Sequence, residues 1–172
     1  MTASSDPAPL VLGIDPGLAR TGWALIGTRL VASGLIETPA RTPLGDRLKR
    51  LHGAVLALLD LHRPEAVALE QLFFLRSTRA IAATSQARGV ILLASALRGL
   101  EAAEYNPRDV KMALTGNGAA LKPQMQRMVR LLLGLREDLR PDDVADAAAI
   151  ALCHQRTRRF LARVAPPAGS RA

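Results

Sequence analysis

Residues 10–26 read LVLGIDPGLARTGWALI, and this stretch contains two strand patterns joined by a turn. The apolar run LVLGID (10–15) is typical of a buried strand, and Pro16-Gly17 predicts a tight turn after it. TGWALIG (21–27) and RLVASGLIET (29–38) read as two further strands. The N-terminal part of the chain is therefore predicted to form a three-stranded meander.

Helical and strand patterns alternate along the rest of the chain. An apolar stripe at helical spacing predicts a helix that begins at Leu44 and ends at Arg63-Pro64. Strands are predicted at 66–70 and 101–105, and helices at 77–97, 106–114, 122–134 and 141–164. This order predicts an α/β protein with a mixed five-stranded sheet flanked by helices. We predict one domain over residues 10–165, with a flexible leader at 1–9 and a flexible tail at 166–172.

Acidic residues stand where the apolar patterns end. Asp15 ends the first strand, Glu70 ends AVALE (66–70), and Asp142, Asp143 and Asp146 open the last helix. Carboxylates at the ends of buried strands are costly to desolvate unless they share a counter-charge, and a pair of divalent metal ions would provide one. Spacing alone does not choose among the helix acids, because positions three apart and four apart both share a face.

The charge balance points to a polyanionic partner. The chain carries a net charge of +8, and only three of its 23 basic residues are lysines. Lys111 and Lys122 bracket the loop LTGNGAAL (114–121), where they suit phosphate contacts or are simply solvated. Phe73 and Phe74 follow Glu70 closely, and an exposed ring there would stack on a base, whereas a buried one would close the core.

Cysteine usage and hydropathy restrict the expected cellular compartment of the protein. The single cysteine, Cys153, excludes an internal disulfide and a cysteine-rich zinc site, which fits a cytoplasmic location. The longest apolar runs are too short for a membrane span.

Six motifs in this order resemble the RuvC-type Holliday-junction resolvases of bacteria, within the ribonuclease H-like superfamily. The resemblance covers about residues 10–160. The matching stretches are LGIDPGLARTGWALI (12–26), ALEQLFF (68–74), SQARGV (85–90), YNPRDVKMALTGNG (105–118), KPQMQRMVRLLL (122–133) and DVADAAAIALCH (143–154). It implies a ribonuclease H-like fold and paired symmetrical nicks in four-way DNA junctions, in recombination and repair.

The resemblance also assigns roles at the acidic residues. It implies two divalent ions per subunit, Mg²⁺ or Mn²⁺, bridged by Asp15 and held further by Glu70, Asp143 and Asp146. The family pattern selects Asp143 over Asp142, which is left near the helix N-terminus where the helix dipole favours a carboxylate.

Further roles and partners follow from the same resemblance. It places Phe73 at the junction crossover and Lys111 and Lys122 at the phosphates of the scissile region, where they support catalysis. It implies a homodimer, for which the small residues of helix 77–97 suggest an interface, and association with a branch-migration motor. Two alternatives stay open: a ribonuclease H-like enzyme acting on RNA or RNA:DNA hybrids, and a junction-binding dimer that does not cut.

Overall fold

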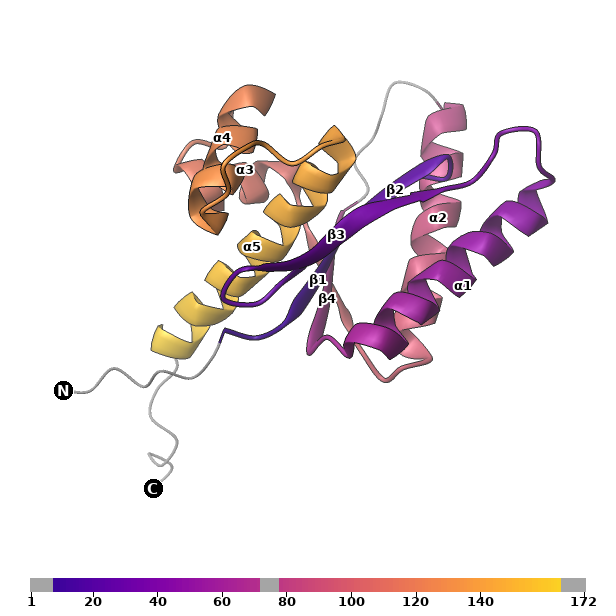
Figure 1. The fold of residues 1–172 in the computed structure, drawn as a ribbon, viewed down its shortest axis with the longest axis horizontal. Coiled ribbons are helices and arrows are strands. Elements are labelled where there is room, and N and C mark those ends of the chain that lie inside the picture. Colours follow the sequence, from indigo (N-terminus) through magenta and orange to yellow (C-terminus); the bar gives the residue numbers. More distant parts are fainter. Residues whose placement is uncertain (1–7, 72–77, 165–172) are drawn as a thin grey trace.

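The computed structural model describes residues 8–71 and 78–164, which form ten elements around one sheet (Figure 1). The strands are β1 (Val11–Asp15), β2 (Arg20–Ile26), β3 (Leu30–Glu37), β4 (Ala66–Glu70) and β5 (Ala102–Tyr105). The helices are α1 (Leu44–His62), α2 (Thr78–Ala96), α3 (Pro107–Thr115), α4 (Lys122–Leu133) and α5 (Asp142–Val164). This order confirms the predicted one, with ends shifted by a residue or two. Most of the predicted leader (1–7), the predicted tail (166–172), and Phe73 and Phe74 lie outside the described residues.

The five strands form a mixed sheet in the order β3-β2-β1-β4-β5. The first three strands are antiparallel neighbours, which is the predicted meander. β4 and β5 run parallel to β1, and β1 lies at the centre between β2 and β4. The sequence of β1 is apolar almost throughout because a central strand is covered on both faces.

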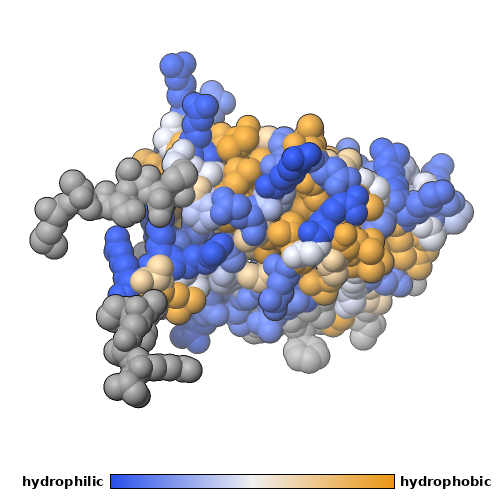
Figure 2. Space-filling model, turned by 90° about the horizontal axis from the view of Figure 1, so that it is seen from below, coloured by the Kyte–Doolittle hydropathy of each residue, from blue (hydrophilic) through white to orange (hydrophobic). Residues whose placement is uncertain are grey.

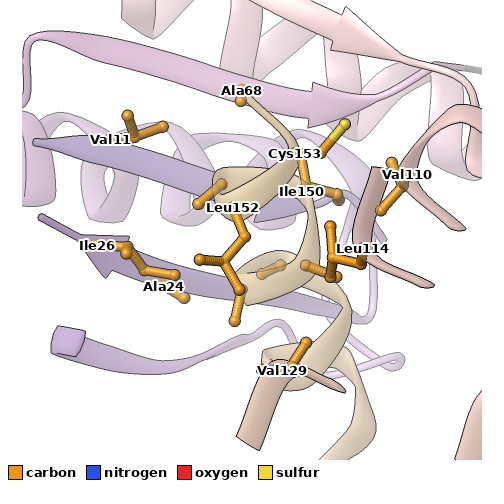
Figure 3. Packing of buried hydrophobic residues seen from close by; sticks show 14 of the residues in the cluster. Val11, Ala24, Ile26, Ala68, Val110, Leu114, Val129, Ile150, Leu152 and Cys153 are labelled. Atoms are coloured by element: carbon orange, nitrogen blue, oxygen red, sulfur yellow. The ribbon is translucent and has the colours of Figure 1, made fainter. Parts of the chain in front are cut away.

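Helices cover both faces of the sheet (Figure 1). Alternate residues of β1 face opposite sides: Leu12 and Ile14 join a core cluster with α1 and α2, whereas Val11 joins a second cluster under α5. In the second cluster, drawn in part in Figure 3, side chains of the sheet such as Ala24 pack with α5 and with Leu114 of α3.

Helix α5 lies unusually close to the sheet at two glycines. A Cβ added at Gly13 would overlap the carbonyl oxygen of Ala147, and one added at Gly22 would overlap that of Asp143. The facing stretch of α5 consists largely of alanine, which lets the helix axis approach the strands. These glycines therefore set the depth at which the N-terminal turns of α5 meet β1 and β2.

The ends of the shorter helices are determined locally. Asn106 accepts a hydrogen bond from the main-chain N–H of Arg108 at 2.8 Å, and Pro107 occupies the first turn of α3. Gly116 and Gly134 take positive φ angles of 74° and 65° after α3 and α4, a conformation that favours glycine.

On the face seen in Figure 2, hydrophilic side chains are interspersed with apolar areas. Among the described helices, none combines the length and hydrophobicity required to cross a bilayer.

Candidate active site

Two carboxylates lie at the same end of the sheet because their strands are parallel neighbours. β1 and β4 pair in register from Val11 with Ala66 to Ile14 with Leu69, so Asp15 and Glu70 end adjacent strands. The sequence alone indicated that each acid ends a strand. The parallel pairing of β1 with β4 brings the two acids together.

Helix α5 adds further acids to the same end of the sheet. Asp15 pairs with Gly22 across β1 and β2, and the main chain of Asp143 lies directly over Gly22. The first turn of α5 is thereby placed beside the end of β1. Asp146, one turn further along the helix, lines the same pocket as Asp15 and Glu70.

This pocket has a volume of about 280 Å³ and forms between these elements and α3 and α4. Three of the predicted acids and both predicted lysines line it. The lining residues are Asp15, Glu70, Pro107, Val110, Lys111, Lys122, Met125, Asp146, Ala149 and Ile150.

Burial and mutual repulsion shift the protonation of the acids in this pocket. Burial raises the pKa of Asp15 to about 7, and the carboxylates of Glu70, Asp146 and Asp143 act in the same direction against Lys122. Burial also raises the pKa of Glu70, with Asp146 adding to it, and burial raises the pKa of Asp146 despite the opposing charge of Lys122. Closely spaced, desolvated acids of this kind are stabilised by a bound cation.

Asp143 stands at the border of this pocket rather than inside it. Its Oδ2 lies 2.9 Å from Nη2 of Arg20, and both residues line a neighbouring hollow together with Lys122 and Asp142. Its charge still raises the pKa of Asp15. Three predicted acids thus share one pocket, and the fourth is close by but paired with an arginine.

The side chains in this arrangement do not form a closed ion cage. Within residues 8–71 and 78–164, no group of three or more acidic, histidine or cysteine side chains has the arrangement of a metal site. Asp143 points to Arg20, and Asp146 contacts Lys122 instead. The donor set itself suits a hard divalent ion, because it consists of carboxylate oxygens in a partly buried pocket.

The two lysines approach the acids from different helices. Lys122 at the start of α4 places Nζ 3.2 Å from Oδ2 of Asp146 and 3.3 Å from Oδ2 of Asp142. Lys111 on α3 lines the pocket, and its charge partly offsets the rise that burial and Asp146 cause in the pKa of Glu70.

The sequence interpretation missed two arginines that support the site. Arg88 of α2 is 9% exposed, donates from Nη1 to the main-chain carbonyl of Glu70, and contacts Glu104 through Nη2 at 2.8 Å. Arg20 pairs with Asp143. Neither stands out in the sequence, because arginine is abundant in this chain. The available signal for Arg88 was a charged residue in the middle of a helix made mostly of apolar and small residues, within the motif SQARGV.

The chain is similar to proteins of one family along most of its length. The family model described as "Crossover junction endodeoxyribonuclease RuvC" matches residues 11–154. A protein of that name from Moorella thermoacetica is 48% identical over 150 residues, which is 84% of this chain and 90% of the relative. One from Desulfitobacterium hafniense is 48% identical over 160 residues, covering 90% and 97%.

Solved structures agree with the sequence relatives. The structure "T. thermophilus RuvC in complex with Holliday junction substrate" superposes with a TM-score of 0.85 at 38% identity, covering 88% of this chain and 96% of that one. The yeast mitochondrial Holliday junction resolvase, at 13% identity and a TM-score of 0.64, shares the fold. The chain therefore belongs to the RuvC family of crossover junction endodeoxyribonucleases.

Proposed function

We propose that this protein is a metal-dependent endonuclease that resolves four-way DNA junctions by paired, symmetrical nicks in recombination and repair. The observation that carries the proposal is one pocket in which three half-buried acids meet two lysines, in a chain of the RuvC family. The RuvC relative from T. thermophilus was solved in complex with a Holliday junction substrate. The +8 net charge suits a DNA ligand.

The acids are the proposed metal ligands. The ions would be held by Asp15, which ends the central strand, by Glu70, which ends the neighbouring strand, and by Asp143 and Asp146 on α5. Two divalent ions, Mg²⁺ or Mn²⁺, would neutralise charge at the attacking and departing oxygens of an in-line phosphodiester displacement. In this arrangement Asp143 would turn from Arg20 toward the pocket, and Asp146 would turn from Lys122.

The lysines are the proposed phosphate contacts. Lys111 and Lys122 line the acidic pocket from α3 and α4, so a phosphate at its mouth would meet both ammonium groups. Each would offset the repulsion between the carboxylates and the DNA backbone. Phe73 lies outside the described residues, and its role at the junction crossover stays a prediction.

The assembly is a proposal drawn from substrate symmetry. A four-way junction that is cut twice in symmetrical positions suits a two-fold dimer with one site per subunit. Helix α2 is the proposed interface: Leu93 is 55% exposed on a helix that buries Ala87, Ile91 and Ala94 against the core. Association with a branch-migration motor and a cytoplasmic location stay predictions.

Cleavage of an end-labelled, mobile four-way junction tests the proposed activity. The wild-type protein with Mg²⁺ or Mn²⁺ should give paired nicks at symmetrical positions on a denaturing gel, and none in excess EDTA. Asp15→Asn is the control for a contaminating nuclease.

The open alternatives have their own outcomes in the same assay. A linear RNA:DNA hybrid cut faster than the junction would make the protein a ribonuclease H-like enzyme for hybrids. Tight junction binding without cutting under any metal would make it a binding protein.

A further inference from the structure

Lys122 lies between two carboxylates that line different pockets. Asp146 lines the acidic pocket, whereas Asp142 lines the neighbouring hollow. The Nζ of Lys122 is nearly equidistant from them, at 3.2 Å from Asp146 and 3.3 Å from Asp142. The ammonium thus has one partner that is a proposed metal ligand and one that is not.

Asp142 is itself held by donors on both sides. Its Oδ1 accepts hydrogen bonds from Nε2 of Gln126 and from Nη1 of Arg140, each at 2.8 Å, which leaves Oδ2 for Lys122. Gln126 lies one turn after Lys122 on α4, so both contact Asp142 from the same helix face. Asp142 is the first residue of α5 and joins that helix to α4. A carboxylate that only favoured the helix dipole would need none of these contacts.

We propose that Asp142 is a positioning residue for DNA cleavage, which holds the Lys122 ammonium at the mouth of the acidic pocket. The proposal rests on the proposed function. When Asp146 turns toward a cation, Lys122 loses that partner. Its side chain is 51% exposed and has a long flexible stem, so without a second anchor it would spread over many rotamers. Asp142 keeps it directed at the incoming phosphate.

The chain offers a matched control. Asp138 pairs with Nε of Arg130 at 3.1 Å and so also joins α4 to the segment before α5, yet its ion pair does not involve Lys122. Its side chain is 36% exposed, close to the 42% of Asp142. Removing either carboxylate takes one negative charge and a link to α4 from the same region, and Asp142 also loses its contact with Arg140.

The first experiment separates cleavage from binding under single-turnover conditions, with enzyme in excess over junction. Asp142→Ala should slow cutting by about 10- to 100-fold, because a misplaced catalytic group loses that much rate. Junction affinity measured with Ca²⁺ should stay equal or become tighter, since a negative charge has been removed near the DNA. Asp142→Glu should recover part of the rate, Asp142→Asn should not, and Asp138→Ala should cut like the wild type.

A double-mutant cycle identifies the residue through which Asp142 acts. In the Lys122→Ala background, Asp142→Ala should change the remaining rate by less than about twofold, because both substitutions remove the same Asp142–Lys122 interaction. If the slowing in the double variant equals the product of the slowing in the two single variants, the proposal is overturned. Equal slowing by Asp138→Ala, or no slowing by Asp142→Ala, would also overturn it.

The second experiment needs no turnover. The chain has only three lysines, Lys49, Lys111 and Lys122, so selective ¹⁵Nζ and ¹³Cε labelling gives three resolvable sets of NMR signals. After Mg²⁺ addition, the Lys122 side chain should stay restricted in the wild type and become mobile in Asp142→Ala. Equal mobility in both proteins would overturn the proposal. A wild-type protein that cuts no junction would instead remove the proposed function, and the positioning role of Asp142 with it.

Discussion

Asp15 shows most clearly what burial does to a single side chain in this protein. Its carboxyl group ends the central strand, and burial together with Glu70, Asp146 and Asp143 raises its pKa to about 7. In the unfolded chain the same group would ionise near its ordinary value of 3.8. The folded protein therefore binds a proton at Asp15 between these two pH values, where the unfolded chain does not.

This difference predicts how stability depends on pH in the absence of metal. Because the native state binds more protons, the free energy of unfolding should fall as the pH rises from about 4 to about 7, by a few kcal/mol for Asp15 alone. Thermal melting in EDTA across this range measures the loss. Asp15→Asn should melt with a shallower pH dependence, and Mg²⁺ should raise the wild-type Tm more at pH 8 than at pH 5.5. A wild-type Tm that rises steadily from pH 4 to pH 7 would contradict the assignment.

Substitution of the pocket acids should abolish cleavage without abolishing DNA binding. Asp15→Asn, Glu70→Gln and Asp146→Asn each keep the shape of the side chain but remove a charged ligand, so each should abolish junction cutting. Junction affinity should persist, because the DNA backbone is contacted mainly by basic groups. Gel-shift titrations in Ca²⁺ and cleavage gels in Mg²⁺ measure the two properties. A variant that cuts at the wild-type rate would remove that residue from the ligand set.

Phe73→Ala carries a related expectation for the ring that is predicted to stack on a base at the junction crossover. Loss of the ring should weaken cutting more than binding, because a stacked ring stabilises the opened crossover rather than the DNA arms. A 2-aminopurine base at the crossover, whose fluorescence reports unstacking, distinguishes this role from a purely structural one. Unchanged fluorescence on binding of the wild type would contradict it.

Helix α5 owes its place to residues on the strands beneath it. The absence of side chains at Gly13 and Gly22 lets the main chain of α5 touch the sheet, which puts Asp143 beside the end of β1 and Asp146 in the pocket. Close packing of this kind has little room to adjust, since protein interiors are as dense as organic crystals.

Gly22→Ala should therefore damage both stability and activity. Overpacking costs about 1–3 kcal/mol of unfolding free energy, and the displaced first turn of α5 should slow junction cutting. Urea denaturation and single-turnover cleavage measure the two effects. Gly45→Ala in α1 is the control, because its added Cβ meets no atom within 4 Å and alanine favours a helix. A Gly22→Ala protein as stable and active as the wild type would show that α5 can shift freely.

The complete molecule must place two sites on one junction to make paired nicks. Light scattering should return about twice the 18.4 kDa of one chain at working concentration. Leu93→Glu should shift this mass toward the monomer and turn paired cuts into rare single nicks, because a charge would be buried in the proposed α2 interface. Leu61→Glu is the control, since Leu61 is 75% exposed on α1. A Leu93→Glu protein that stays dimeric would exclude this face of α2 as the interface.

Much of the architecture could be read from local patterns. Apolar runs, Pro-Gly turns and helical stripes predicted all ten elements in order, because each depends on residues close together in the chain. The same patterns showed that Asp15 and Glu70 end strands. The resemblance to the RuvC family followed from motifs whose order and spacing can be recognised without any knowledge of contacts.

The site itself depended on contacts between distant parts of the chain. The sequence determined which residue types stand at the strand ends and helix starts, because those positions follow from local periodicity. Only the folded arrangement decided that Asp143 pairs with Arg20, that Arg88 lies buried behind Glu70, and that Lys122 joins Asp142 to Asp146. The physical reason is that a charged side chain takes its partner from whatever group packing brings within a few ångströms, and no local pattern encodes that distance.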